Sequence, residues 1–312
     1  MNNQKYSLKT QDAIAEIEAP STDKHTELSN NKVVSPTRMF LERFKSERMA
    51  IAALCILLLF IILAIFAPIL LTNTATSVDY NNVLSSPSWA HWAGTDSYGR
   101  DIFTRLIYGA RISLTVGFVS VSIGAVIGTF LGIISGYRGG WVDAVIMRAA
   151  DVLFAFPSFL LAIGIVAVLG GGIINVVIAI AIFSTPTFAR IVRSTTLSVV
   201  NSQYVKAAKT MGASHFRIMF LHILPSTMSS VIVYFTMRVG TSVLTAASLS
   251  FLGLGAQPPS PEWGAMLAAS RDFMSIEGFM YLTVFPGVCI FLTVLSCNVL
   301  GDGLRSALDP KN

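Results

Sequence analysis

Residues 204–225 have the sequence Tyr-Val-Lys-Ala-Ala-Lys-Thr-Met-Gly-Ala-Ser-His-Phe-Arg-Ile-Met-Phe-Leu-His-Ile-Leu-Pro, the longest polar interruption with a folded pattern in the apolar C-terminal two-thirds of the chain. The i, i+3, i+4, i+7 spacing of one helix stripe is met by Tyr204, Ala207, Ala208 and Met211. It is met again, after a break at Gly212, by Phe216, Met219, Phe220 and Ile223. We expect Leu224-Pro225 to end the second helix, because proline cannot continue the hydrogen-bond ladder.

Each of these two short helices has an apolar or small face to bury and a cationic face. The cations are Lys206, Lys209 and Arg217. On pattern alone, the stretch is typical of an amphipathic loop that lies at a membrane interface, between two spans.

The composition predicts a membrane protein. Of 312 residues, 53% are hydrophobic and only 12% are charged. Each of six apolar runs is long enough to cross a hydrocarbon core of about 30 Å as a helix. The expected fold is therefore an all-α membrane protein with six transmembrane helices, at about 49–71, 112–136, 144–169, 173–189, 227–250 and 282–301.

The charge distribution predicts the topology. The net charge of +5 comes from basic residues that flank the spans, so a nucleic-acid-binding patch is not indicated. A cluster precedes the first span: Arg38, Arg43, Lys45 and Arg48. By the positive-inside rule, the N-terminus lies in the cytoplasm, and six spans return the C-terminus there.

We divide the chain into four regions. They are a disordered cytoplasmic tail, 1–37; an N-terminal region with the first span and an external loop, 38–111; the transmembrane domain, 112–305; and a cytoplasmic tail, 306–312. The first of these is rich in polar residues without an apolar period, which is typical of disorder.

The predicted external side has two notable features. Residues 72–99 contain no Lys or Arg, whereas Arg100, Arg105 and Arg111 follow them and conflict with the charge rule. A short amphipathic segment at the interface would reconcile these arginines with an external position. In the loop 250–267, Trp263 suits the interface as well.

Several residues predict how the spans are built. Glycines recur every four residues in the second span, at Gly124, Gly128, Gly132 and Gly136, and predict close helix packing, within the chain or with a partner. Arg148 and Asp151 are three apart and are expected to pair on one helix face. Pro157 is expected to kink the third span, and the fourth is expected to end around Pro186.

Arg238 is the most informative single residue. It lies about a dozen residues into the fifth span, or roughly 18 Å along a helix axis, close to mid-membrane. An arginine there costs about 2.5–3.5 kcal/mol on an insertion scale, and such residues usually face a cavity. Two interpretations stay open: Arg238 faces a translocation path and attracts an anionic substrate group, or it pairs with a partner subunit.

Some chemistry is missing from the sequence. There is no Gly-Lys pair, hence no phosphate-binding loop of the Gly-x-x-x-x-Gly-Lys-Ser/Thr type. The four histidines are scattered without metal-ligand spacing, and no nucleophile–base arrangement stands out, so neither a catalytic residue nor a metal site is predicted. The cysteines Cys55, Cys289 and Cys297 lie in spans, where packed thiols are expected.

The motifs resemble a known family. Ala207-Ala208, Gly212 and Leu224-Pro225 resemble the cytoplasmic "EAA" loop of ABC-importer permeases, although Lys206 replaces the acidic first residue. Together with Gly94–Leu114, Ser250–Leu267 and Gly301–Pro310, they make residues 38–310 similar to the C-type permease of the dipeptide/oligopeptide/nickel ABC-importer family. The run Phe235–Pro259 is most similar to the glutathione-importer branch.

The resemblance implies a type I ABC-importer permease in the bacterial inner membrane. It is a transport subunit, not an enzyme, that forms half of a path for peptides. Its implied partners are a homologous permease, two ATPases that hold ATP and Mg²⁺, and an extracytoplasmic substrate-binding protein. Coupling to the ATPases is implied for Tyr204, Ala207, Ala208, Gly212, Leu224 and Pro225.

Three alternatives remain. The substrate of a permease in this family can be nickel or a metal chelate in place of a peptide. An ATP-independent secondary transporter or channel would also have several spans and a buried arginine, although no internal repeat is visible here. A purely structural membrane scaffold would leave Arg238 unexplained.

Overall fold

The computed structural model describes residues 36–71 and 74–308. The chain divides into two compact units, 1–42 and 43–312, and the second carries all the features discussed below. Most of the predicted disordered tail, 1–37, lies outside the described residues; helix α3 (Pro36–Ser46) begins at its end. The described residues are helical apart from loops and one isolated bridge, Thr95–Asp101.

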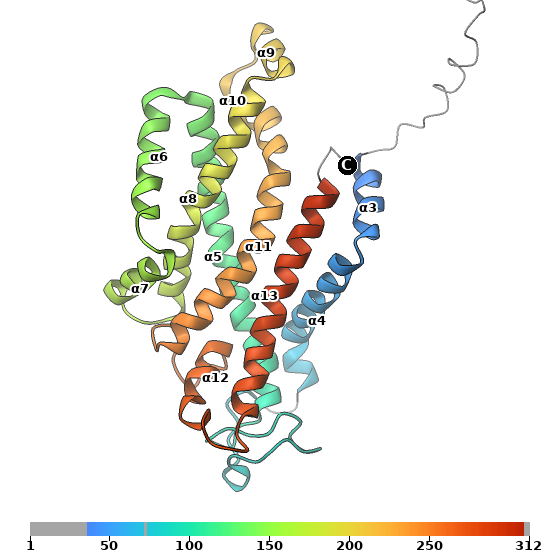
Figure 1. Ribbon diagram of the computed structural model, residues 1–312, viewed down its shortest axis with the longest axis vertical. Coiled ribbons are helices and arrows are strands. Elements are labelled where there is room, and N and C mark those ends of the chain that lie inside the picture. Colours follow the sequence, from blue (N-terminus) through green and yellow to red (C-terminus); the bar gives the residue numbers. More distant parts are fainter. Residues whose placement is uncertain (1–35, 72–73, 309–312) are drawn as a thin grey trace, which may run out of the picture. The chain divides into compact units, whose positions relative to one another are not determined.

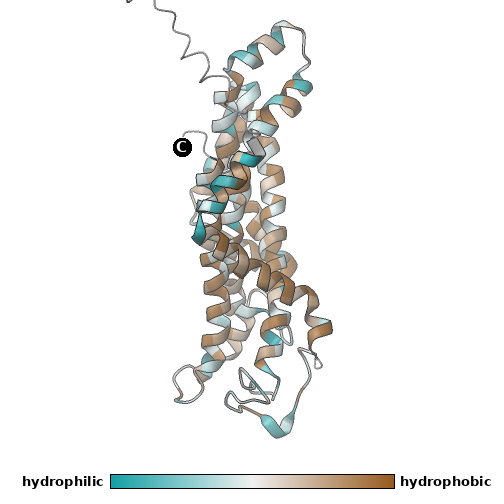
Figure 2. Cartoon of the chain, turned by 90° about the vertical axis from the view of Figure 1, so that its right-hand side faces the viewer, coloured by the Kyte–Doolittle hydropathy of each residue, from teal (hydrophilic) through white to brown (hydrophobic). Residues whose placement is uncertain are grey.

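Five helices of the described part are long and apolar enough to cross a membrane. They are α4 (Arg48–Leu70), α5 (Ile102–Arg138), α8 (Ile173–Val200), a continuous helix His215–Phe251 that ends in α11 (Leu224–Phe251), and α13 (Tyr281–Leu308). Apolar residues occupy the middle of these helices, whereas polar residues gather at both ends of the bundle (Figure 2). The helices α9 (Gln203–Thr210) and α12 (Trp263–Ala269) mark opposite ends (Figure 1), called here the α9 end and the α12 end.

The predicted third span is broken. Helix α6 (Gly140–Phe154) and helix α7 (Ser158–Leu169) meet at 89°, so the described part has five span candidates, or six where this bent pair is counted as one span. Pro157 immediately precedes α7 in an extended conformation, since a proline has no N–H for the ladder and its ring disfavours helix before it. The predicted kink at Pro157 is confirmed, but it is sharp enough to form an elbow.

The predicted boundaries differ from the helix ends at three other places. The fourth span does not end around Pro186: α8 runs through this buried proline to Val200. Neighbouring helices make such a proline tolerable in a membrane span. The boundary between 111 and 112 falls inside α5, and α13 continues to Leu308, past the predicted end of the transmembrane domain at 305.

The glycines of α5 pack against α8. A Cβ atom on Gly128 would lie 2.5 Å from the Thr185 carbonyl oxygen, and one on Gly132 would lie 2.5 Å from that of Ala189. The close packing predicted from the glycine spacing is therefore confirmed, and its partner is a helix of the same chain. Helix α5 lies behind, and α11 packs against both helices of this pair, between α8 and α13 (Figure 1).

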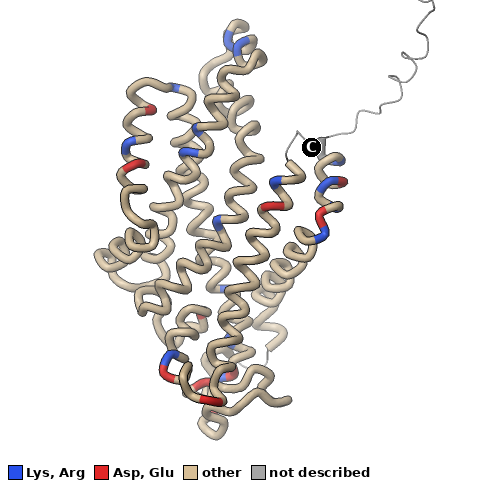
Figure 3. The backbone as a smooth tube through the Cα atoms, viewed as in Figure 1, with Lys and Arg blue, Asp and Glu red and all other residues tan. Residues whose placement is uncertain are grey.

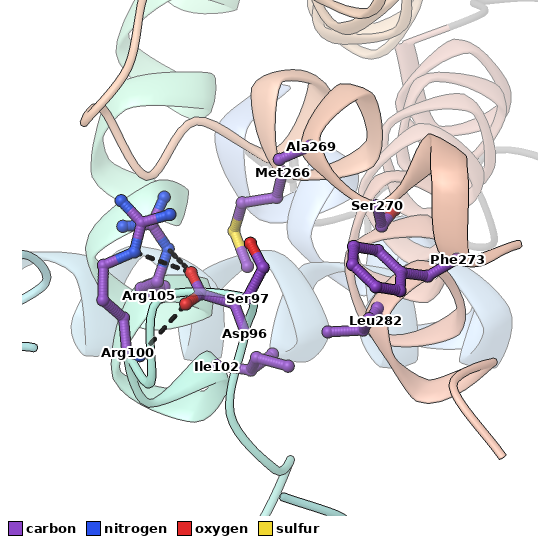
Figure 4. A pocket seen from close by; sticks show the side chains of 10 residues that line it. All are labelled: Asp96, Ser97, Arg100, Ile102, Arg105, Met266, Ala269, Ser270, Phe273 and Leu282. Atoms are coloured by element: carbon purple, nitrogen blue, oxygen red, sulfur yellow. Dashed lines mark hydrogen bonds and ion pairs between the residues drawn. The ribbon is translucent and has the colours of Figure 1, made fainter. Parts of the chain in front are cut away.

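A buried ionic cluster fixes the loops of the α12 end. The Asp96 carboxylate pairs with Arg100 at 2.7 Å and with Arg105 at 3.6 Å (Figure 4). Arg105 also donates to the carbonyl oxygens of Ala75 at 2.8 Å and of Ser260 at 3.3 Å. The interface segment predicted for these arginines is therefore wrong for Arg100 and Arg105, which are buried because a carboxylate and carbonyl groups satisfy them.

Trp263 also lies elsewhere than predicted. Its side chain is fully buried, and the indole N–H donates to the Leu106 carbonyl oxygen at 3.0 Å. Phe60 of α4 meets it edge to face, with 5.7 Å between ring centroids. Trp263 is thus a core residue that joins α4, α5 and α12, because a hydrogen-bond acceptor is available to its N–H inside the bundle.

Candidate coupling loop and substrate path

The loop at the α9 end consists of two helices joined at a glycine, as predicted. Helix α9 ends at Thr210, and Gly212 follows with φ +81°, a left-handed conformation that other residues rarely adopt. Ala213 then donates its N–H to the Ala208 carbonyl oxygen at 3.0 Å, which closes the turn. Ser214 caps the next helix, α10 (His215–Ile218), by accepting from the Arg217 N–H at 3.3 Å.

The faces of this loop differ from the prediction. Val205 and Ala208 are buried, and Val205 joins a core cluster with Ile218 and Ile223. Tyr204, Ala207 and Met211, three members of the predicted stripe, lie on the exposed side. The exposed apolar surface of the loop, called here the loop face, is made by Tyr204, Ala207, Met211 and Phe216.

Pro225 does not end the second helix. From His215 the chain continues as one helix to Phe251, through a π-helical segment, η3 (Met219–Ile223), directly before Leu224-Pro225. A π-type turn shifts the hydrogen bonds by one residue and makes room for the proline ring in the first turn of α11. The loop is therefore joined rigidly to the span that carries Arg238.

Polar contacts hold the loop to the bundle. The Tyr137 hydroxyl group lies 2.6 Å from Nδ1 of His215, and Nζ of Lys209 lies 5.1 Å from the Tyr137 ring centroid. Tyr204 contacts the Ser226 hydroxyl group at 3.3 Å. His215 is therefore a contact between the loop and α5. Among the described residues no group of three or more His, Cys, Asp or Glu side chains is placed to hold a metal ion.

Arg238 lies in a cavity of about 310 Å³ between α11, α8 and the α6–α7 elbow. Its Cζ is 5.0 Å from the Phe183 ring centroid, and its Nε is buried without a hydrogen-bond partner. No carboxylate in the described part of the chain pairs with it, and the sequence has no acidic residue between Asp151 and Glu262. Further walls of the cavity come from Phe154, Phe156, Ser158, Pro186 and Thr187.

Two ion pairs attach α6 to α8 near this cavity. Asp151 pairs with Arg190 at 2.8 Å, and Asp143 accepts from Arg193 at 2.6 Å as well as from Ser135. We predicted that Asp151 pairs with Arg148 on one helix. This prediction is wrong, because in the described part of the chain Asp151 pairs across helices with Arg190. The i, i+3 spacing permits a pair on one helix, but the packing of α6 on α8 brings a nearer guanidinium group. The sequence alone did not reveal these two contacts.

The comparisons with known proteins agree with this architecture. Residues 128–312 match the family described as "Binding-protein-dependent transport system inner membrane component", and residues 35–87 match the "N-terminal TM domain of oligopeptide transport permease C". The chain is similar in fold to the MetNI methionine ABC transporter in an inward-facing conformation. The native crystal form gives a TM-score of 0.54 at 18% identity, over 67% of this chain and 98% of that chain. The selenomethionine-soaked crystal form gives a TM-score of 0.52 at 19% identity, over 66% of this chain and 97% of that chain.

Curated relatives share a much higher sequence identity with this chain than these solved structures do. The glutathione transport system permease protein GsiD of Pectobacterium atrosepticum is 52% identical over 91% of this chain and 94% of its own length. The protein of that name in Escherichia coli O6:K15:H31 is 54% identical over 90% of this chain and 92% of its own. The chain therefore belongs to the family of binding-protein-dependent transport system inner membrane components, as a multi-pass ABC-transporter permease of the oligopeptide permease C type.

Proposed function

We propose that this chain is one of two homologous permeases of an ATP-driven importer for net anionic peptides, with glutathione as the first candidate. The observation that carries the substrate class is the Arg238 guanidinium group, held midway along α11 in a cavity without a counter-ion from the described residues. Such a buried charge is retained where a ligand or a water-filled path meets it. Relatives more than 50% identical over nine-tenths of the chain are named for glutathione transport, and glutathione is a net anionic tripeptide.

The loop face is the proposed contact with an ATPase subunit. It exposes Met211 and Phe216, and exposed apolar groups of this size mark interaction surfaces. Ala207 and Gly212 let the partner approach closely, whereas Ala208 holds the loop to its own bundle. Because α10, η3 and α11 are continuous, a movement of the loop by the ATPase reaches Arg238 without an intervening hinge.

The partners follow from this arrangement. One ATPase contacts this chain and a second contacts the homologous permease, and both hold ATP and Mg²⁺. An extracytoplasmic binding protein delivers the substrate at the α12 end. The proposed orientation puts the α9 end and both termini in the cytoplasm, because the loop at this end carries Lys206, Lys209 and Arg217. Lys and Arg are visible at the tip of this loop (Figure 3).

Uptake of labelled glutathione by cells that lack only this chain tests the proposal. Unlabelled dipeptide, a longer peptide and a nickel chelate serve as competitors. We expect uptake to be lost without the chain, restored by it, and competed by glutathione alone. Unchanged uptake in a strain without another glutathione importer, or competition by the nickel chelate alone, would contradict the proposed substrate and leave the family assignment standing.

A further inference from the structure

Helix α11 has a polar face that runs along most of its length. Its members recur every three or four residues, and none is buried; we call them the α11 stripe: Ser230, Tyr234, Arg238, Thr241, Thr245 and Ser248. Val243 and Ala246, which lie on the side of the helix away from the stripe, are buried. From Ser230 to Ser248 the stripe extends about 27 Å along the helix axis, close to the hydrocarbon thickness of about 30 Å.

Four members of the stripe border cavities. Three cavities lie beside α11, of about 380, 310 and 600 Å³. The first, toward the α9 end, contains Ser230 and Tyr234, and the second contains Arg238. The third, toward the α12 end, contains Ser248 among apolar side chains. Helix α5 lies behind α11, and α8 and α13 flank it (Figure 1), so these cavities lie between α11 and its neighbours.

The polar stripe differs from a lipid-facing surface. Helix α4 shows what such a surface looks like here, because its exposed side chains are large and apolar, among them Leu59, Ile62, Ile65 and Ile69. The hydroxyl groups of Thr241, Thr245 and Ser248 bond to carbonyl groups one turn back, which lipid would tolerate. Arg238 and the hydroxyl group of Tyr234 have no such partner among the described residues, so water or a ligand must satisfy them.

A second cation lies on this path. Arg305 of α13 borders the cavity of about 380 Å³ together with Tyr234, Ser229 and Ser230. It is exposed and forms no ion pair within the described part of the chain, not even with Asp302, three residues before it. Tyr234 is one helical turn, about 6 Å, from Arg238 along α11. The two guanidinium groups therefore border different cavities beside α11, and Tyr234 lines the one that contains Arg305.

We propose that the α11 stripe lines a hydrated path, and that Arg305 with Tyr234 forms a second anion site that receives a peptide carboxylate after it leaves Arg238. This inference rests on the proposed function of anionic-peptide import. A single strong site at mid-span would bind a carboxylate and release it slowly. Two successive cationic sites let each step be favourable enough to enter and weak enough to leave, which passage through a membrane requires.

Thiol accessibility tests the path without any substrate. In the complete transporter, the free cysteines Cys55, Cys289 and Cys297 are first replaced by alanine. Single cysteines are then placed on the stripe, as Ser230→Cys and Thr245→Cys, and labelled with a membrane-impermeant sulfonate reagent. The matched control is Ile232→Cys, an exposed position on the other side of α11 at the depth of Ser230.

We expect the stripe cysteines to react at least about tenfold faster than the cysteine at position 232, because the reagent needs a hydrated thiolate. Equal rates at stripe and control positions would overturn the hydrated path. This result would leave the proposed substrate untouched, since no substrate enters the measurement.

Substitutions at Arg305 test the second site. With labelled glutathione, Arg305→Gln is expected to lower the maximal uptake rate about tenfold or more with little change in KM, since a charge-assisted hydrogen bond is lost after initial binding. Arg305→Lys is expected to retain most of the rate. The control is Arg148→Gln, an exposed arginine on α6, and the amount of each variant in the membrane is measured in parallel.

Unchanged uptake by Arg305→Gln, or an equal loss in Arg305→Lys and Arg305→Gln, would overturn the second anion site. If the wild-type transporter takes up no glutathione, the proposed substrate fails instead. The accessibility experiment then still decides whether the α11 stripe lines a hydrated path.

Discussion

The guanidinium group of Arg238 lies over the ring of Phe183, with 5.0 Å between Cζ and the ring centroid. This cation–π contact joins α11 to α8 near the middle of α11. It leaves the hydrogen-bonding groups of the arginine without a partner among the described residues. A ring face offsets part of the cost of an intramembrane charge, by about 1–2 kcal/mol, and still leaves the charge free to attract an anion.

Replacement of Arg238 should abolish this attraction. We expect Arg238→Ala to lower glutathione uptake by at least about tenfold, because a charge-assisted hydrogen bond contributes about 1.5–3 kcal/mol. Arg238→Lys keeps the charge but loses the planar fork, and its uptake should be intermediate. The complex should assemble in both variants, as measured by copurification with the ATPase. Normal uptake by Arg238→Ala would exclude the residue from the path.

Gly212→Asp should uncouple ATP hydrolysis from uptake. Gly212 has φ +81° and lies at the turn of the loop, so a side chain there strains the turn and adds charge beside the loop face. ATPase activity and uptake are measured in the same proteoliposomes.

The control for this variant is Gly278→Asp. Gly278 has φ +90° in a loop at the α12 end, and a Cβ atom at either glycine would meet nothing within 4 Å. The strain is thus similar, and only the position differs. Preserved coupling in Gly212→Asp, or an equal defect in both variants, would count against the loop as the ATPase contact.

Trp263→Ala should destabilise the protein. The side chain is fully buried, and its loss removes contacts with α4 and a hydrogen bond to the Leu106 carbonyl group, for a cost of about 3–5 kcal/mol. Thermal unfolding in detergent measures this loss. Trp89→Ala is the matched control, because Trp89 is 97% exposed, and its unfolding temperature should equal that of the wild type. Equal unfolding temperatures for both variants would contradict the core position of Trp263.

Stability should depend on pH through Glu262. This carboxyl group is buried at the start of α12, and burial raises its pKa above the ordinary 4.5, although hydrogen bonds from Gly264 and Ala265 oppose the shift. A raised pKa means that the folded state holds the proton more tightly than the unfolded state. The contribution of Glu262 is therefore most favourable at low pH and declines as pH rises from about 4.5 through the folded-state pKa.

The difference in unfolding temperature between the wild type and Glu262→Gln isolates this contribution. Glutamine keeps the shape of the cap without the charge. We expect the wild type to lose stability relative to the variant as pH rises above about 4.5. A difference that is constant with pH would show that Glu262 has the same pKa in both states.

Much of the fold follows from local sequence. An apolar run of sufficient length must form a helix in lipid, since every backbone group needs an internal partner. The spans were predicted for this reason. The turn at Gly212 and the kink at Pro157 were predicted from the backbone preferences of glycine and proline. The prolines were less informative about where a helix ends. Pro157 lies at the elbow between α6 and α7, Pro186 lies inside the uninterrupted helix α8, and Pro225 follows a π-helical segment. Proline removes one hydrogen bond in every case, and its neighbours decide the outcome.

The sequence by itself determined that this chain is a helical membrane protein, that its loop at 204–225 is amphipathic, and that Arg238 lies at mid-span. Periodicity and hydropathy act within one segment, so they can be read along the chain. Only the tertiary structure decided which side of each helix is covered. It buried Trp263 and Arg105, paired Asp151 with Arg190, and left the α11 stripe open, because these outcomes depend on partners distant in sequence.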